Sequence, residues 1–417
     1  MDKIRISGGV PLRGEVRVSG AKNSALPVLI SALVGEGPSV YEGVPDLQDI
    51  KTTELVLNHL GLVSRFENNR MTLDATKIAT VDAPYDLVRK MRASVLVLGP
   101  LVARMGEAKV SLPGGCAIGA RPINFHLTAL EKLGAKITLE NGYVIAQAKR
   151  LQGNRVVFEF PSVGATENIM MAAALARGET VLENCAKEPE IVDLAVALRS
   201  MGAVIEGEGT ETIRIQGKDR LNGARHTIVG DRIEAGTFLA AALATGGQVK
   251  VLGLAPVHLD SVLDKFEEAG AKITRETDSM TLEATGRPKG TDIKTLPFPG
   301  FPTDMQAQFM AAMCVAEGSS VISETIFENR FMHVPELTRM GADLTIRSNT
   351  VHVRGKGKLI GAPVMATDLR ASASLIIAGM AAEGETVVSR IYHLDRGYER
   401  MEEKLRKLGA RIERVKD

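Results

Sequence analysis

The chain has 417 residues, of which 45% are hydrophobic and 24% are charged, and its 51 basic and 50 acidic side chains leave a net charge of only +1. Because a single hydrophobic core stops growing at about 250–300 residues, a chain of this length predicts more than one domain. The balanced charge gives no electrostatic reason to bind nucleic acid or an acidic membrane, no apolar run reaches the roughly 18–20 residues of a membrane span, and the three irregularly spaced cysteines match neither a disulfide framework nor a zinc site.

A tripeptide of the Leu-Gly-Ala type recurs along the whole chain. Its central glycines are Gly61, Gly134, Gly202, Gly270, Gly341 and Gly409. The interval of about 70 residues indicates six copies of one structural unit. In each copy an alanine-rich segment ends at a glycine and is followed by a β-branched strand, an amphipathic helix and alternating strands. Since the tripeptide glycine follows the amphipathic helix, we expect it to end that helix with a positive φ.

Each copy contains two kinds of helix. The alanine-rich segments, such as residues 238–245 and 374–382, are apolar on nearly every face, so we expect them to be buried and to pack against one another inside each domain. Residues 259–268 represent the second kind, whose single charged face predicts a helix on the outside. The predicted fold class is therefore α/β (α+β). A repeat scaffold without chemistry is the simplest interpretation of this pattern alone.

Charged and hydroxyl residues occupy the predicted starts of the buried helices. In chain order these starts are Lys22-Asn23-Ser24, Arg92-Ala93-Ser94, Ser162-Val163-Gly164, Asp231-Arg232, Thr303-Asp304 and Thr367-Asp368-Leu369-Arg370. Serine, threonine and aspartate are ordinary N-caps. Lys22, Arg92 and Arg370 are not, because a cation at this end opposes the helix macrodipole. We therefore expect anions at these helix starts.

Arginines also recur near the predicted starts of the outer helices. Arg121, Arg330 and Arg396 occupy related positions in their repeats. Each one alone is equally compatible with a solvated surface position. Their recurrence favours a set of guanidinium groups that bind phosphate or carboxylate through paired hydrogen bonds.

The segment Leu112-Pro113-Gly114-Gly115-Cys116-Ala117-Ile118-Gly119-Ala120-Arg121 is typical of a mobile functional loop, because its three glycines and one proline exclude a helix or a central strand. Cys116 is therefore expected to be accessible, and the nearby arginines would favour its thiolate form. An inert loop thiol is the alternative. Cys185 and Cys314 are interpreted as structural residues.

Asp304 is the second candidate for chemistry. It is either a plain helix cap or a carboxylate that acts as a general base. His126 and His333 lie on predicted outer helices and are expected at the surface. No dinucleotide-binding, Walker A or HExxH pattern occurs, so nucleotide hydrolysis and zinc peptidase activity lack the residues that they require.

Four segments carry a family resemblance. They are Val18-Ser19-Gly20-Ala21-Lys22-Asn23-Ser24, Leu112-Pro113-Gly114-Gly115-Cys116, Phe301-Pro302-Thr303-Asp304-Met305-Gln306 and Asp395-Arg396-Gly397-Tyr398-Glu399-Arg400. Together they resemble the UDP-N-acetylglucosamine 1-carboxyvinyltransferase family, enolpyruvyl transferases that open peptidoglycan precursor synthesis, and the similarity extends over essentially the whole chain. The resemblance implies two similar domains, each of three βαβαββ repeats around buried helices in an inside-out α/β barrel. Residues 22–229 would form the first domain, and residues 1–21 with 230–417 the second.

The resemblance also implies a role for each candidate residue. Phosphoenolpyruvate would be bound by Lys22, Asn23, Arg121 and Arg396. The nucleotide sugar would be bound by Arg92, Arg121, Pro122, Ile123, Asn124, Phe125, Ser162, Val163, Gly164, Asp304 and Ile326. Cys116 would protonate C3 of phosphoenolpyruvate and also form a covalent adduct with it, while Asp304 would accept the proton of the sugar 3′-hydroxyl. Catalysis would further need Lys22 and Arg396, with support from Arg330, Asp368 and Arg370.

The same resemblance implies no metal and no organic cofactor, and neither nucleic acid nor a membrane as a partner. Because the first residues lack the apolar core of a signal peptide, a cytoplasmic enzyme is expected. The 5-enolpyruvylshikimate-3-phosphate synthases share the fold and the chemistry and are the nearest alternative, but the Pro-Gly-Gly-Cys loop and Asn23 argue against them. A non-enzymatic repeat scaffold is the other alternative, and it would not need cations at buried helix starts.

Overall fold

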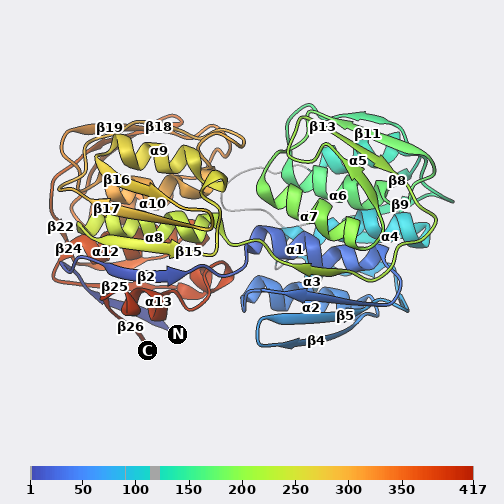
Figure 1. Cartoon of the computed structure of the whole chain (residues 1–417), viewed down its shortest axis with the longest axis horizontal. Helices are drawn as coiled ribbons and strands as arrows, with labels where there is room; N and C mark the ends of the chain where they lie inside the picture. Colours follow the sequence, from blue (N-terminus) through green and yellow to red (C-terminus); the bar gives the residue numbers. More distant parts are fainter. Residues whose placement is uncertain (1, 90, 113–122, 417) are drawn as a thin grey trace. The chain divides into compact units, whose positions relative to one another are not determined.

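The computed structural model describes residues 2–89, 91–112 and 123–416 (Figure 1). Within these ranges the chain forms two compact units, one made of residues 2–19 and 230–416 and the other of the described residues between 20 and 229. The chain therefore passes from one unit to the other after Ser19 and returns after Val229. The predicted site residues Cys116, Arg121 and Pro122 lie outside the described residues.

The described strands of the unit within residues 20–229 form three four-stranded sheets. The strands are β3 (Pro38–Glu42), β4 (Val63–Glu67), β5 (Arg70–Asp74), β6 (Asp82–Ala83), β7 (Glu107–Ser111), β8 (Lys136–Glu140), β9 (Tyr143–Gln147), β10 (Arg155–Val157), β11 (Glu179–Glu183), β12 (Val204–Glu206), β13 (Thr212–Gln216) and β14 (Arg225–Thr227). Their orders are β14-β3-β5-β4, β6-β7-β9-β8 and β10-β11-β13-β12.

The described part of the other unit also contains three four-stranded sheets, together with a small two-stranded one. The strands are β1 (Lys3–Ser7), β2 (Arg13–Arg17), β15 (Gln248–Leu252), β16 (Ala271–Arg275), β17 (Ser279–Ala284), β18 (Ile293–Lys294), β19 (Ser319–Ser323), β20 (Asp343–Arg347), β21 (Thr350–Arg354), β22 (Leu359–Ile360), β23 (Pro363–Met365), β24 (Ala382–Glu383), β25 (Glu385–Ser389) and β26 (Arg411–Val415). The four-stranded orders are β23-β25-β1-β26, β16-β17-β15-β2 and β18-β19-β21-β20, and β22 pairs with β24.

All six four-stranded sheets combine one parallel pair with two antiparallel pairs. In the first of them, β3 runs parallel to β14 and antiparallel to β5, which is in turn antiparallel to β4. Ser39 and Tyr41 of β3 are buried while Pro38 and Glu42 are exposed, which is the period of two expected when one face of a sheet covers a core. The shared pattern confirms the prediction of six repeats, three in each unit.

The inner helices of the repeats are those predicted from the alanine-rich segments. They are α1 (Lys22–Ile30) with η1 (Ser31–Val34), η2 (Arg92–Val97) with α4 (Leu98–Met105), α6 (Val163–Ala173), α8 (Arg232–Thr245), η4 (Thr303–Met305) with α10 (Gln306–Met313), and α12 (Leu369–Ala381). Every residue of α8 from Arg232 to Leu243 is buried, and α8, α10 and α12 pack against one another. The prediction of mutually packed, buried helices is confirmed.

The remaining described helices include the amphipathic ones. They are α2 (Gln48–His59), α3 (Tyr85–Val88), α5 (Asn124–Lys132), α7 (Pro189–Ser200), η3 (Pro256–His258), α9 (Asp260–Glu268), α11 (Val334–Arg339), η5 (Ile391–Arg396) and α13 (Met401–Lys407). In α9 the buried residues Val262, Leu263 and Phe266 share one face, as the sequence pattern predicts. None of the helices in the described ranges is long and apolar enough to cross a membrane.

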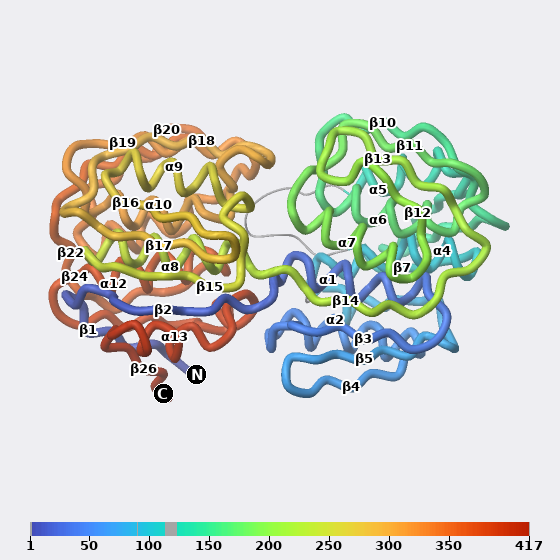
Figure 2. The backbone as a smooth tube through the Cα atoms, in the orientation of Figure 1, coloured from blue at the N-terminus to red at the C-terminus, as the bar shows by residue number. Residues whose placement is uncertain are grey.

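The N-terminal segment belongs to the unit that is otherwise formed by the second half of the chain. Strand β1 lies between β25 and β26, with Lys3 opposite Val415, so the two ends of the chain lie side by side (Figure 2). Strand β2 runs parallel to β15. The first residues therefore complete two of the three four-stranded sheets of this unit.

The six tripeptide glycines have the backbone conformation predicted for them. Their φ angles lie between 88° at Gly341 and 109° at Gly61. A residue with a Cβ atom is strained in this region, so glycine allows each outer helix to end abruptly before the next strand.

Candidate active site

Asp304 is the centre of an ion-pair cluster in the unit of residues 2–19 and 230–416. Its Oδ1 accepts a hydrogen bond from Arg330 Nη2 at 2.8 Å, and its Oδ2 accepts two from Arg370, from Nε at 3.1 Å and from Nη2 at 2.9 Å. The Asp304 side chain is 24% exposed, whereas those of Arg330 and Arg370 are 6% and 2% exposed. The carboxylate of Asp304 is therefore the most accessible group of the cluster, and the two arginines that bind it are buried.

Packing of the inner helices brings these charges together. Asp304 lies in η4 at the start of α10, and Arg370 is near the start of α12, which packs against α10. Asp368 is the N-cap of α12, and its side chain accepts hydrogen bonds from the backbone N–H groups of Arg370 and Ala371 at 2.8 and 3.0 Å. We expected the cation Arg370 to bind an anion at this helix start. It does, and the anion is the carboxylate of Asp304 in the same protein.

The charges around Asp304 control its protonation. Burial alone would raise the pKa of this carboxyl group, but the positive charges of Arg370 and Arg330 and their hydrogen bonds hold its pKa well below the ordinary value. Asp304 is thus ionised throughout the neutral range. It is a weak base towards a neutral hydroxyl group, and it can accept a proton readily only from a strongly acidic donor.

A buried polar network supports the arginine side of the cluster. The guanidinium of Arg370 lies 5.3 Å from the ring centroid of Tyr398. The hydroxyl of Tyr398 lies 2.9 Å from Thr237 Oγ1 and accepts a hydrogen bond from Gln308 Nε2 at 3.1 Å. These partners come from α8 and α10, so all three inner helices of the unit fix the position of Arg370.

Lys22 forms a comparable pair in the unit of residues 20–229. It is the first residue of α1, and its Nζ lies 3.2 Å from Oδ2 of Asp49 on α2. The two side chains are 13% and 3% exposed. The expected anion is again a carboxylate of the protein, which the sequence pattern did not reveal. Asn23 follows Lys22 in the same helix.

His126 is buried, not at the surface as predicted, with 6% of the residue exposed. Its Nδ1 lies 2.9 Å from Nδ2 of Asn168, and since the amide nitrogen can only donate, Nδ1 accepts and Nε2 carries the hydrogen. Burial and the nearby positive charge of Arg92 lower the pKa of His126 to about 4. His333 is buried as well, with 1% exposed. Both predictions failed: His126 lies on the buried face of α5, and His333 is the buried residue that directly precedes α11.

The other predicted residues of this unit cluster around helix starts. Ser162 is the N-cap of α6, and its Oγ accepts a hydrogen bond from the Ala165 backbone at 3.3 Å. A Cβ atom at Gly164 would lie 3.4 Å from Cε1 of His126, so α6 and the buried imidazole approach closely there. Ile123 is the N-cap of α5, followed by Asn124 and Phe125.

The structure thus divides the described candidate residues between the two units. The unit of residues 20–229 holds Lys22, Asn23, Arg92, Ile123, Asn124, Phe125, Ser162, Val163 and Gly164. The unit of residues 2–19 and 230–416 holds Asp304, Ile326, Arg330, Asp368, Arg370 and Arg396, the last of these at the end of η5. Hydrogen bonds join Asp304 to both Arg330 and Arg370.

Sequence reasoning missed Asp49 and the buried Glu324. Each interacts with residues far away in the sequence, so no local pattern marks it. Within the described ranges no group of three or more histidine, cysteine, aspartate or glutamate side chains is arranged to hold a metal ion.

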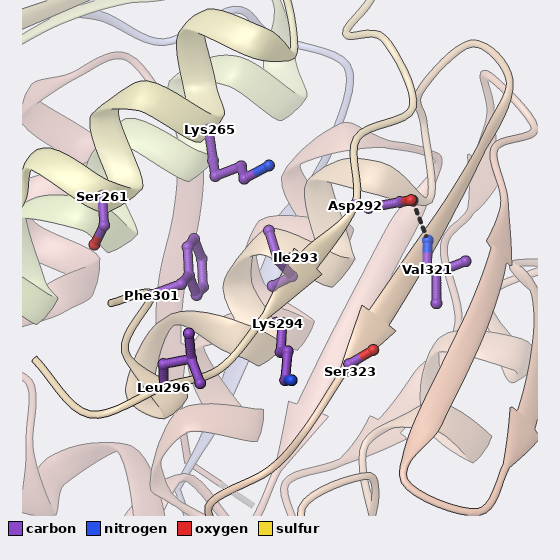
Figure 3. A pocket seen from close by; sticks show the side chains of 9 residues that line it. All are labelled: Ser261, Lys265, Asp292, Ile293, Lys294, Leu296, Phe301, Val321 and Ser323. Atoms are coloured by element: carbon purple, nitrogen blue, oxygen red, sulfur yellow. Dashed lines mark hydrogen bonds between the residues drawn. The ribbon is translucent and has the colours of Figure 1, made fainter. Parts of the chain in front are cut away.

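A cavity of about 450 Å³ lies in the same unit as Asp304, between α9 and strands β18 and β19 (Figure 3). Its lining residues are Ser261, Lys265, Asp292, Ile293, Lys294, Leu296, Phe301, Val321 and Ser323. None of the predicted site residues is among them. The candidate site in this unit is therefore the charged cluster around Asp304, and this cavity is a separate feature.

Comparison with known proteins shows the family of the chain. Residues 6–405 match the family model described as EPSP synthase (3-phosphoshikimate 1-carboxyvinyltransferase). The chain is 59% identical over 417 residues to the UDP-N-acetylglucosamine 1-carboxyvinyltransferase of Geobacter metallireducens, and 58% identical over 418 residues to that of Trichlorobacter lovleyi. Each match covers 100% of this chain and 100% of the relative.

Solved structures resemble the whole chain as well. The enolpyruvyl transferase NikO from Streptomyces tendae superimposes with a TM-score of 0.87 at 26% identity, covering 99% of both chains. EPSP synthase from Acinetobacter baumannii superimposes with a TM-score of 0.78 at 20% identity, covering 100% of both, which shows a common fold. The predicted enolpyruvyl transferase fold is confirmed.

Proposed function

Because the chain belongs to the EPSP synthase family of carboxyvinyltransferases, we propose that it transfers the enolpyruvyl group of phosphoenolpyruvate to the 3′-hydroxyl of UDP-N-acetylglucosamine. The products are phosphate and UDP-N-acetylglucosamine-enolpyruvate. The observation that carries this proposal is identity of 56–59% over the full length of relatives that bear the name of this activity. The activity opens peptidoglycan precursor synthesis, and its soluble substrates suit a cytoplasmic enzyme that supports cell-wall growth, cell shape and cell division.

Lys22 and Asn23, together with Arg121 and Arg396, bind the phosphate and carboxylate of phosphoenolpyruvate. The position of Lys22 at the first residue of α1 supports this role, since both its ammonium group and the helix N-terminus attract an anion. Asp49 holds the ammonium in place. The proposed reaction uses no metal and no organic cofactor.

The proposed ligands of the nucleotide sugar belong to two sets, one in each unit of the chain. One set comprises Arg92, Arg121, Pro122, Ile123, Asn124, Phe125, Ser162, Val163 and Gly164, and the other comprises Asp304 and Ile326. We take residues 22–229 as one domain and residues 1–21 with 230–417 as the other. Arg330, Asp368 and Arg370 support the site through the contacts with Asp304 and the start of α12.

The reaction proceeds by addition and elimination. Cys116 donates its thiol proton to C3 of phosphoenolpyruvate, the developing positive charge at C2 is attacked by the sugar 3′-oxygen, and a tetrahedral adduct forms. Cys116 also forms a covalent adduct with phosphoenolpyruvate. The tetrahedral adduct of the two substrates then transfers a proton from C3 to the Cys116 thiolate and loses its phosphate group, which restores the carbon–carbon double bond and regenerates the thiol.

The low pKa of Asp304 suits its part in this sequence. While the hydroxyl group is neutral, Asp304 accepts its hydrogen bond and orients it. Once the oxygen bonds to C2 it carries positive charge, so its proton becomes strongly acidic and a carboxylate of low pKa can accept it. The two arginines keep Asp304 ionised and ready for this step.

A phosphate-release assay tests the proposal. Purified protein is incubated with phosphoenolpyruvate and either UDP-N-acetylglucosamine or shikimate 3-phosphate. Release that requires the nucleotide sugar, with the enolpyruvyl ether identified by mass spectrometry, is the expected result. Release with shikimate 3-phosphate alone would assign the chain to the other activity of the family, and no release with either acceptor would favour a non-enzymatic scaffold.

A further inference from the structure

Glu324 is a buried carboxylate that directly follows strand β19, and the proposed reaction assigns it no role. Only 3% of the residue is exposed. Its Oε1 accepts hydrogen bonds from Thr295 Oγ1 at 2.8 Å and from the backbone nitrogens of Ile326 and Phe327 at 2.8 and 3.2 Å, while its Oε2 accepts one from Thr303 Oγ1 at 2.9 Å. A buried carboxylate needs such partners, so Glu324 organises the chain segments that supply them.

The hydroxyl of Thr303 connects Glu324 to the ion-pair cluster. It accepts a hydrogen bond from Arg330 Nη1 at 2.9 Å and donates its one hydrogen to Glu324. The direction is fixed, because a guanidinium only donates and a carboxylate only accepts. The same guanidinium donates through Nη2 to Asp304. A continuous hydrogen-bonded chain therefore runs from Glu324 through Thr303 and Arg330 to Asp304.

The other oxygen of Glu324, Oε1, holds the segment that contains Ile326 and Phe327. It accepts the N–H groups of Ile326 and Phe327, and the Phe327 ring centroid lies 5.4 Å from the guanidinium of Arg330. The Glu324 backbone is itself anchored, since its N–H donates to Asn349 O at 2.9 Å and its carbonyl accepts from Asn349 Nδ2 at 3.3 Å. Glu324 is thus held in place between the segment of Thr303 and the segment of Ile326 and Phe327.

We propose that Glu324 is a positioning residue that sets the spacing between Asp304 and Ile326 for the nucleotide sugar. The inference rests on the proposed function, which gives both residues to that substrate. Glu324 acts through Thr303 on one side and through the Ile326 backbone on the other. Because one rigid carboxylate group holds both segments, loss of either bond lets Asp304 and Ile326 move independently, and a small misplacement of binding groups is costly.

Thr303→Val tests this arrangement at a single atom. The substitution keeps the shape of the side chain, removes the hydroxyl link and leaves the bonds between Arg370 and Asp304 in place. We expect the KM for UDP-N-acetylglucosamine to rise about tenfold or more while the KM for phosphoenolpyruvate changes less than about threefold. Thr303→Ser restores the hydroxyl and should bring the nucleotide-sugar KM back to within about threefold of the wild type.

Thr386→Val is the matched control. Thr386 is buried in the same unit, and its hydroxyl has no hydrogen-bond partner among the described residues. The control therefore makes the same chemical change without breaking a bond, and both KM values should stay at the wild-type level. Thermal unfolding of all variants separates a loss of stability from a loss of positioning.

Glu324→Gln supplies a second test. Its oxygen must face the N–H groups of Ile326 and Phe327, so its amide nitrogen faces Thr303 and the bond between them reverses. We expect the same selective rise in the nucleotide-sugar KM. The double variant Glu324→Gln/Thr303→Val should be no worse than either single variant, since both remove the hydrogen bond that the Thr303 hydroxyl donates to residue 324.

The outcomes separate the two proposals. The positioning role would be overturned if both KM values changed equally, if neither changed, or if Thr386→Val produced the same change. In each of these cases turnover by the wild-type protein would still uphold the proposed function. A wild-type protein that neither turns over nor binds UDP-N-acetylglucosamine would overturn the proposed function, and the positioning role would fall with it.

Discussion

Arg370 holds a single oxygen of Asp304 with two N–H groups, Nε at 3.1 Å and Nη2 at 2.9 Å. The other oxygen is bound by Arg330. A buried cation at a helix start, which opposes the helix dipole, is thereby compensated by a carboxylate at the start of the neighbouring helix. The same pairing leaves the carboxylate partly exposed and permanently ionised, which suits a residue that binds a hydroxyl group and later accepts its proton.

Asp304→Asn should lower kcat by about a hundredfold or more, because an amide cannot accept the proton of the attacking oxygen. The wild-type kcat should show no acid limb from Asp304 in the neutral range, since its pKa lies well below the ordinary value of 3.8. Steady-state phosphate release from pH 5 to pH 9 measures both quantities. If the variant retains more than about a third of the wild-type kcat, Asp304 is not the proton acceptor.

Lys22→Met should weaken phosphoenolpyruvate binding more than nucleotide-sugar binding, as judged by separate titrations. It should also destabilise the protein by about 3 kcal/mol, because it leaves Asp49 buried without its ammonium partner. Adding Asp49→Asn should recover most of the stability but none of the phosphoenolpyruvate affinity. Recovery of both in the double variant would mean that Lys22 acts only as the partner of Asp49.

Acid should destabilise the protein through His126. Its pKa is about 4 in the folded protein and 6.5 as its ordinary value, so between these values the unfolded chain binds a proton that the folded protein does not. This contribution is fully present above pH 6.5 and falls as the pH decreases towards 4, by up to about 3 kcal/mol. Urea unfolding at pH 7.5, 6 and 5 measures the slope. His126→Gln should reduce the slope but not abolish it, because burial also lowers the pKa of His333 to about 4. His352→Gln, at an exposed position, should leave the slope unchanged.

Thiol reagents should modify one cysteine in the native protein. Burial raises the pKa values of Cys185 and Cys314 to about 12, so neither thiol ionises at neutral pH. Peptide mapping after brief treatment with iodoacetamide should therefore locate the label on Cys116. Labelling of Cys314 before Cys116 would contradict the interpretation of the glycine-rich loop.

Cys116→Ser should abolish most turnover and retain nucleotide-sugar binding, because a serine hydroxyl is a far weaker acid than a thiol. Cys116→Asp is the informative companion, since a carboxyl group can also donate a proton and should retain activity while resisting thiol-directed epoxides. Turnover of Cys116→Ser equal to that of the wild type would remove this residue from the mechanism.

The repeats were predictable because their signals are local. An alanine-rich helix, an amphipathic helix and a glycine with positive φ each leave a pattern within a few residues, and the recurrence of that pattern defines six units. The cations at helix starts were visible for the same reason. The motifs around Lys22, Cys116, Asp304 and Arg396 led from there to the family.

The partners of these residues were decided by the tertiary structure. Asp49 pairs with Lys22 because α2 packs against α1, and Glu324 connects Thr303 to Ile326 because a turn after β19 reaches the start of α10. His126 looked like a surface residue until the packing of α5 against α6 buried it against Asn168. Hydrophobic periodicity in the sequence indicates which face of a helix or strand packs against the core. Hydrogen-bond partners and protonation depend on which elements meet, and that is determined by contacts between residues far apart in the chain.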